Sequence, residues 1–160
     1  MPAVNILAVN HIGVSVSDMQ RAIVFFRDVL GASVTEPVVV DYTNLEKVNG
    51  VPKSKLNACF ATLHGVSFEL LEYYAPEGMP VSDHHPGNAG HLHIGLTVNN
   101  IEEVAAKMDA AGFRPVGPVQ WGLSNLDIAA VYTYGFDNLV VELLQFDAPG
   151  THAALRPAAE

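Results

Sequence analysis

Cysteine is almost absent from this sequence, because Cys59 is the only one in 160 residues. A single cysteine has no partner for an intrachain disulfide, so other interactions must hold the fold together. The first residues also lack the basic start and long apolar centre that are typical of a secretory signal. Both features favour a reducing cytoplasm as the location of the protein.

Positive charge and long apolar runs are scarce as well. Eight Lys and Arg against 17 Asp and Glu give a net charge of −9, which disfavours binding to the phosphate backbone of a nucleic acid. No run approaches the roughly 18 consecutive apolar residues of a membrane span, because residues such as Asp18, Arg21 and Glu69 interrupt the apolar stretches. The sequence therefore predicts a small-molecule partner, with neither a nucleic-acid partner nor a membrane span.

The sequence does contain an internal repeat. H-I-G-V-S-V at 11–16 returns as H-I-G-L-T-V at 93–98, and V-S-F-E-L-L-E-Y at 66–73 returns as L-V-V-E-L-L-Q-F at 139–146. Alternating or β-branched runs of this kind predict strands. The second pair of segments follows a further strand and a turn, so it predicts the end of a β-hairpin in each copy.

A helix is predicted after each copy of the first segment. Ser17 and Asn100 both stand three residues before a Gln or Glu, which fits a capping box at the start of a helix. Gly31 and Gly112 follow the two apolar helical patterns and predict the helix ends. Each copy therefore has the order β-α-β-β-β.

The two copies define modules at residues 8–74 and 91–147, joined by a linker rich in Pro and Gly at 75–90. Together they make one predicted domain over 1–160. The first module is longer, and its additional residues 41–55 are polar with Gly and Pro, which predicts a surface excursion that covers a pocket.

Four polar residues stand at equivalent points of the two copies, in segments that are otherwise apolar: His11, Glu69, His93 and Glu142. A carboxylate on a buried strand face is costly unless it is paired or bound to a metal. Two neutral imidazoles and two carboxylates offer N and O ligands to a divalent ion and balance its charge. We therefore predict one divalent metal ion per chain, and this ligand set is compatible with Zn, Ni, Co, Mn or Fe.

These motifs resemble those of the vicinal oxygen chelate superfamily, which includes glyoxalase I, methylmalonyl-CoA epimerase, extradiol dioxygenases and the fosfomycin and bleomycin resistance proteins. The resemblance covers roughly residues 8–147 and rests on N-H-I-G-V-S-V-S-D-M, F-F-R-D-V-L-G-A, F-E-L-L-E-Y, G-H-L-H-I-G-L-T-V and L-V-V-E-L-L-Q-F. It implies an α+β fold in which two tandem βαβββ modules form an open, curled mixed β-sheet trough with helices outside. It also implies that the two His and two Glu are the metal ligands, and that the chain forms a homodimer.

The complete His, Glu, His, Glu set resembles the glyoxalase and epimerase branch of that superfamily. It implies an isomerase, epimerase or lyase that abstracts a proton next to a metal-bound carbonyl, with Glu69 or Glu142 as the base. A triad of His11, His93 and Glu142 alone would indicate an Fe(II) extradiol-type dioxygenase. A protein that only sequesters a small molecule is the non-enzymatic alternative.

Four further residues are candidates for contact with substrate. His91 stands two residues before His93, and Tyr73 shares the strand face of Glu69. Trp121 and Tyr132 are predicted to line an apolar pocket. His84 and His85 are assigned instead to the solvated linker, and no basic cluster is evident that would hold the carboxylates of glutathione or the phosphates of coenzyme A.

Overall fold

The computed structural model describes residues 5–76, 80–81, 85–123 and 128–146. The chain divides into two compact units, Met1–Pro80 and Val81–Glu160. The division falls inside the segment that the sequence predicts as the linker. None of the described helices is long and apolar enough to cross a membrane.

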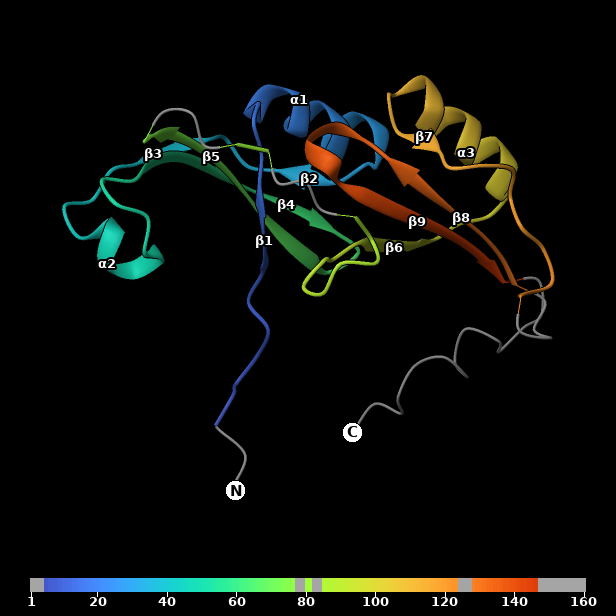
Figure 1. Ribbon diagram of the computed structural model, residues 1–160, viewed down its shortest axis with the longest axis horizontal. Coiled ribbons are helices and arrows are strands. Elements are labelled where there is room, and N and C mark those ends of the chain that lie inside the picture. The colour runs from blue at the N-terminus through green and yellow to red at the C-terminus, as the bar shows by residue number, and fades with distance from the viewer. Residues whose placement is uncertain (1–4, 77–79, 82–84, 124–127, 147–160) are drawn as a thin grey trace. The chain divides into compact units, whose positions relative to one another are not determined.

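The first unit is a mixed sheet with a helix packed against it (Figure 1). Its sheet has the order β1-β5-β4-β2, and β3 also pairs with β4. The edge strand β1 is parallel to β5, and the other pairs are antiparallel. The elements are β1 (Ile12–Ser15), α1 (Met19–Val24), a π-helical turn (Phe25–Val29), β2 (Ser33–Val34), β3 (Val38–Val40), α2 (Leu45–Asn49), β4 (Lys55–Leu63) and β5 (Val66–Ala75).

The second unit repeats this plan, and its described residues contain no counterpart of β3 or α2. Its sheet has the order β6-β9-β8-β7, again with the first strand parallel to the last. The elements are β6 (Ile94–Thr97), α3 (Ile101–Ala110), β7 (Arg114–Pro115), β8 (Ile128–Tyr134), a 3-10 turn (Phe136–Asn138) and β9 (Val140–Phe146). The predicted α+β class, with open mixed sheets and a β-α-β-β-β order in each half, is confirmed.

Strand alternation gives each sheet one face for its helix and one face for the polar residues. In the first unit, Phe68 packs on Phe26 of the helical segment with ring centroids 5.3 Å apart, and both residues are buried. In the second unit, Val141 and Leu143 of β9 are fully buried. Glu69 and Glu142 are one residue out of phase with these positions, so they lie on the opposite faces.

The predicted helix ends are confirmed, but both predicted capping boxes are wrong. Gly31 and Gly112 adopt left-handed φ values of 77° and 86° after their helices. Asp18, rather than Ser17, caps α1 by accepting a hydrogen bond from the backbone N–H three residues later. Asn100 stands at the N-cap of α3 in a left-handed conformation and makes no side-chain capping bond.

A side chain from the last strand of each unit accepts the first backbone N–H of the helix. Glu72 Oε1 accepts from Met19 N–H at 3.0 Å, and Gln145 Oε1 accepts from Ile101 N–H at 2.8 Å. The two acceptors stand three residues after Glu69 and Glu142. Each unit therefore ties its helix to the strand that carries the site glutamate.

The predicted excursion at 41–55 contains the short helix α2 and packs on the site face of the first sheet. Leu45 is buried against Leu56 and Ala58, and Leu71 and Tyr73 join the same cluster. Because Leu71 and Tyr73 alternate in phase with Glu69, the excursion covers the part of that face next to the glutamate.

Candidate metal and substrate site

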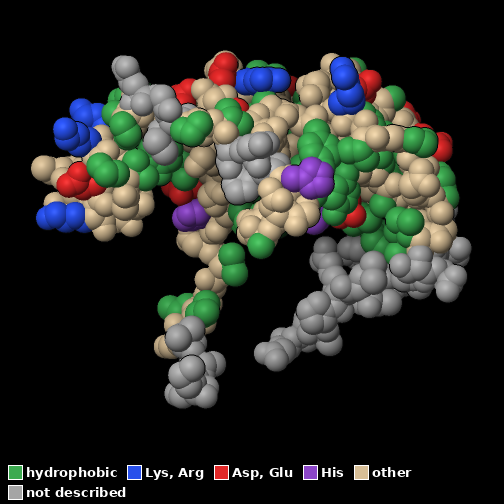
Figure 2. Space-filling model, viewed as in Figure 1, with side chains coloured by type: hydrophobic (Ala, Val, Ile, Leu, Met, Phe, Trp, Pro, Cys, Tyr) green, Lys and Arg blue, Asp and Glu red, His purple; other side chains and the backbone are tan. Residues whose placement is uncertain are grey.

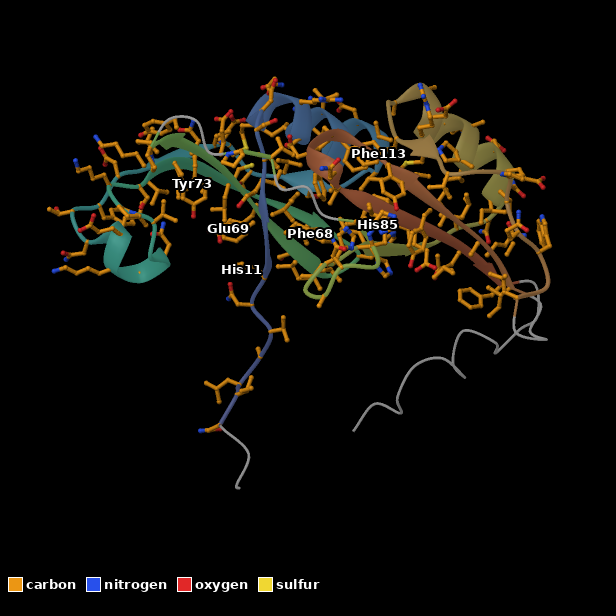
Figure 3. The ribbon with its side chains drawn as sticks, viewed as in Figure 1. His11, Phe68, Glu69, Tyr73, His85 and Phe113 are labelled. Atoms are coloured by element: carbon orange, nitrogen blue, oxygen red, sulfur yellow. The ribbon has the colours of Figure 1, made fainter. Side chains whose placement is uncertain are left out.

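His11 and Glu69 face each other in the first unit. His11 Nε2 lies 2.9 Å from Glu69 Oε2, and Figure 3 shows the two residues next to each other, with Tyr73 further along β5 towards α2. The parallel register places Gly13 opposite Glu69. His11 stands two residues before Gly13, so it is directed to the same face although the strand begins only at Ile12.

The hydrogen bond behind His11 sets the tautomer of its ring. His11 Nδ1 is 2.8 Å from Asn10 Oδ1, and because an amide oxygen only accepts, Nδ1 carries the hydrogen. A ring with its only hydrogen on Nδ1 directs the lone pair of Nε2 at Glu69 Oε2, which is also an acceptor, so a cation between the two atoms would satisfy both. This is the arrangement in which a metal-binding histidine is oriented by a hydrogen bond from its other nitrogen.

His93 and Glu142 form the corresponding pair in the second unit. His93 Nε2 lies 3.2 Å from Glu142 Oε2, and Gly95 is the register partner of Glu142. A β-carbon at Gly95 would contact Glu142 Oε2 at 3.8 Å, so the glycine keeps space beside the carboxylate. The two pairs therefore have similar separations, the same parallel strand pairing and a glycine opposite the glutamate.

An aromatic ring from the neighbouring strand flanks each histidine. Phe60 lies edge-on to His11 with ring centroids 5.8 Å apart, and Tyr132 lies against His93 at 5.1 Å. Phe60 is the register partner of Glu69, and Tyr132 is that of Glu142. Burial raises the pKa of Tyr132, and the Glu142 carboxylate raises it further. Tyr132 therefore lies beside the His93–Glu142 pair.

The chemistry of each pair fits ligands of one divalent ion. Two ligands that are each about 2.1 Å from an ion, at an angle of about 90 to 100°, lie about 3.0 to 3.2 Å apart. The observed separations are 2.9 and 3.2 Å, and the carboxylates remain 24% and 21% exposed. Among the described residues of either unit, no third His, Cys, Asp or Glu joins the pair in a group that could hold a metal. Each unit, taken by itself, therefore brings together two side chains of the metal-ligand type.

A pocket of about 530 Å³ opens beside Glu142 in the second unit. Its wall is largely apolar, and its polar members include Gln120, Tyr132, Tyr134 and Glu142. A volume of this size is typical of sites for small molecules. The pocket and the His93–Glu142 pair thus share the carboxylate.

The other predicted substrate contacts lie in different surroundings. Trp121 is not among the residues that line this pocket, and its indole N–H donates to Glu102 at the start of α3. The hydroxyl of Tyr73 accepts from Asn49 of α2 at 3.4 Å. His91 is half-buried and lies before β6 rather than within it. The roles predicted for these residues stay predictions.

His85 is the residue that the interpretation of the sequence missed. It lines the pocket together with Glu142, and Figure 3 labels it in the second unit. His84, assigned with it to the linker, lies outside the described residues. His85 stands in a segment rich in Pro and Gly without strand or helix periodicity. The imidazole itself was therefore the only sequence feature that pointed to a functional role.

The sequence matches one known family and, over part of its length, two curated enzymes. The model of the Glyoxalase/Bleomycin resistance protein/Dioxygenase superfamily matches residues 8–125. Mitochondrial methylmalonyl-CoA epimerases from Mus musculus and Bos taurus are 32% and 29% identical over 101 residues, which is 62% of this chain. The matched part is 49% of the mouse protein and 51% of the bovine one. The chain thus spans about half the length of the curated relatives it matches.

Solved structures of similar fold cover nearly the whole chain. A glyoxalase family protein from Bacillus cereus has a TM-score of 0.73 at 20% identity, covering 91% of this chain and 97% of that one. A fosfomycin resistance protein from Listeria monocytogenes has a TM-score of 0.60 at 18% identity, covering 88% and 94%. A variant of the Listeria protein, solved with Mn(II) and 1S,2S-dihydroxypropylphosphonic acid, has a TM-score of 0.56 at 16% identity, covering 87% and 90%. At these identities the likeness establishes the fold.

Proposed function

Because the chain belongs to the glyoxalase/bleomycin resistance protein/dioxygenase superfamily, we propose that it is a divalent-metal-dependent isomerase, epimerase or lyase. It would act by removing a proton next to a carbonyl group of a small molecule. The observation that carries the proposal is the recurrence of one His–Glu pair, with the same register, in both units. The resemblance to this superfamily predicted from the sequence is confirmed.

In this proposal His11, Glu69, His93 and Glu142 hold one divalent ion per chain, of Zn, Ni, Co, Mn or Fe. When bound, such an ion supplies positive charge that stabilises the negative charge developing on a carbonyl oxygen. Two carboxylates and two neutral imidazoles leave the loaded site neutral, which removes the cost of placing carboxylates on these strand faces. Asn10 contributes by holding His11 in the ligand tautomer.

Glu69 or Glu142 is the base that takes the proton from carbon. Both carboxylates are partly exposed, so a bound molecule can reach them. The two epimerases that match part of the chain support proton transfer of this kind, because inverting a stereocentre next to a carbonyl requires loss and return of a proton.

The test is hydrogen exchange at carbon. The metal-loaded chain is incubated in D2O with 2-oxoaldehyde adducts and acyl thioesters, and proton NMR follows replacement of the hydrogen next to the carbonyl. We expect exchange in the parent chain and a loss of about 100- to 10,000-fold in Glu69→Gln or Glu142→Gln. Glu103→Gln is the matched control, because Glu103 is exposed on α3, where it pairs with Lys107.

Two results would favour an alternative function over the proposed one. Iron-dependent oxygen uptake with a catechol that persists in Glu69→Gln would indicate the dioxygenase alternative. A ligand that binds unchanged, without metal, to the His11→Ala and Glu142→Ala variants would indicate a protein that only sequesters small molecules.

We extend the proposal to a homodimer. Large apolar side chains of the N-terminal segment are mostly exposed in the single chain, with Ile6 at 71%, Leu7 at 92% and Val9 at 85%. Covering them against a second copy would remove this surface from water. Sedimentation velocity of the parent chain and of Leu7→Ser tests this: a dimer weakened by the substitution supports it, and a monomeric parent chain contradicts it.

A further inference from the structure

We propose that the substrate is an aryl or alkyl ketone or aldehyde whose uncharged, apolar part occupies the pocket beside Glu142. In this proposal His85 donates a hydrogen bond to the same molecule. This inference rests on the proposed function, because it names the substrate class of that same site. It differs from methylmalonyl-CoA, which the names of the partial relatives give.

The walls of the pocket favour an apolar occupant. Pro86, Leu123 and Val131 line it together with the rings of Tyr132 and Tyr134. Apolar and aromatic walls gain free energy by covering apolar surface of a ligand. A volume of about 530 Å³ leaves ample room for a single aromatic ring with a short side chain.

The charges around the pocket disfavour an anionic occupant. Glu142 is the only Asp or Glu among the described lining residues, and none of them is Lys or Arg. Arg114 is the register partner of Tyr134 but does not line the pocket, and Lys107 pairs with Glu103 on α3. On the face that Figure 2 shows, Lys and Arg side chains lie over α1, around α2 and at the end of α3 near β7. A phosphate or carboxylate in the pocket would lack a cation from its wall.

His85 is held as a donor. Its Nδ1 accepts from the Gly87 N–H at 3.2 Å, so a neutral ring carries its hydrogen on Nε2. The turn is closed by a hydrogen bond from Asn88 N–H to the His85 carbonyl at 2.8 Å. A ketone or aldehyde oxygen is an acceptor that suits such a donor, whereas the Glu142 side chain only accepts.

The experiment compares two isosteric probes, acetophenone and benzoate, with the full chain as purified, in the presence and absence of EDTA. Dissociation constants come from ligand-observed NMR titrations at pH 7.5. We expect acetophenone to bind about tenfold or more tightly than benzoate in both arms. Benzoate binding that equals or exceeds acetophenone binding in both arms would overturn the inference.

Paired variants test whether the preference for acetophenone over benzoate arises in the pocket. His85→Phe should weaken acetophenone binding about three- to tenfold, and His85→Gln, which keeps a donor, should restore most of it. Val116→Lys adds a cation to the pocket wall and should tighten benzoate binding about two- to fivefold. Val24→Lys makes the same change of net charge on the exposed side of α1 and should leave the dissociation constants of both probes unchanged. Equal effects of the two lysine variants, or unaltered acetophenone binding in His85→Phe, would overturn the inference.

The outcomes separate this inference from the proposed function. If the chain prefers acetophenone to benzoate but binds no metal, only the metal-dependent reaction is contradicted. A metal-loaded chain that exchanges carbon-bound hydrogen yet prefers benzoate in both arms would contradict only the substrate class.

Discussion

His11 donates its Nδ1–H to the side-chain oxygen of Asn10 at 2.8 Å, and this bond leaves Nε2 directed at Glu69. Removing the acceptor in Asn10→Ala should free the ring and lower metal affinity about 10- to 100-fold. Isothermal titration of the metal-free chain with Zn or Ni measures the affinity.

Asn10→Asp is the conservative variant, because it keeps an acceptor at the same place and should retain the affinity of the parent. Asn44→Ala is the control for a generic effect, since Asn44 makes no capping hydrogen bond at α2. Equal affinities in the parent and Asn10→Ala would refute the orienting role.

Glu72 caps α1 from the last strand, and its second oxygen accepts from Asn57 at 2.9 Å. Glu72→Ala removes both bonds and should lower the free energy of unfolding by about 1–3 kcal/mol. Glu72→Gln keeps an acceptor for the helix and should cost much less. Urea denaturation measures both, and equal losses in the two variants would show that the charge, rather than the cap, stabilises the helix.

Gly135 lies so close to the ring of Phe113 that a β-carbon would clash with it. Phe113 is buried against Phe136, so the ring cannot move aside freely. Gly135→Ala should therefore destabilise the chain by about 1–3 kcal/mol. Gly117→Ala, where a β-carbon would meet nothing within 4 Å, is the matched control for thermal denaturation, and similar melting temperatures would contradict the packing argument.

Burial raises the pKa of the Cys59 thiol, whose sulfur lies 3.4 Å from that of Met19. The folded chain thus holds the thiol proton more tightly than the unfolded chain. The stability that this provides is complete below the unfolded pKa of about 8.5 and declines as the pH rises through the raised value.

The comparison of the parent with Cys59→Ala isolates this contribution, because all other groups titrate in both chains. The difference in unfolding free energy should shrink between about pH 8 and pH 10. Urea denaturation across that range measures the difference, and a constant difference would contradict the role of Cys59.

The sequence predicts the four candidate ligands because two independent regularities converge on them. The H-I-G motif and the mid-strand glutamate recur in both halves, and all four residues interrupt segments that are otherwise apolar. Within each unit the structure places the histidine beside the glutamate. Gly31 and Gly112 were likewise predictable, because left-handed backbone after a helix favours glycine.

The features that the sequence did not reveal depend on contacts between distant residues. Glu72, beside the local cap Asp18, and Gln145 accept the first N–H of their helices from strands more than 40 residues away. His85 escaped prediction because the Pro- and Gly-rich segment around it has no periodicity from which to infer the direction of a side chain. Trp121 bonds to Glu102, which its aromatic character alone does not indicate.

Metal analysis of three chains, the parent, Glu69→Ala and Glu142→Ala, tests the central claim most directly. Each is purified without added metal, then incubated with Ni, Co, Zn, Mn or Fe(II), and bound metal per chain is measured by plasma mass spectrometry. A single site shared by both pairs predicts about one divalent ion per parent chain and its loss from both variants. Two ions per parent chain with one retained in each variant, or no ion bound under any of these conditions, would contradict the account.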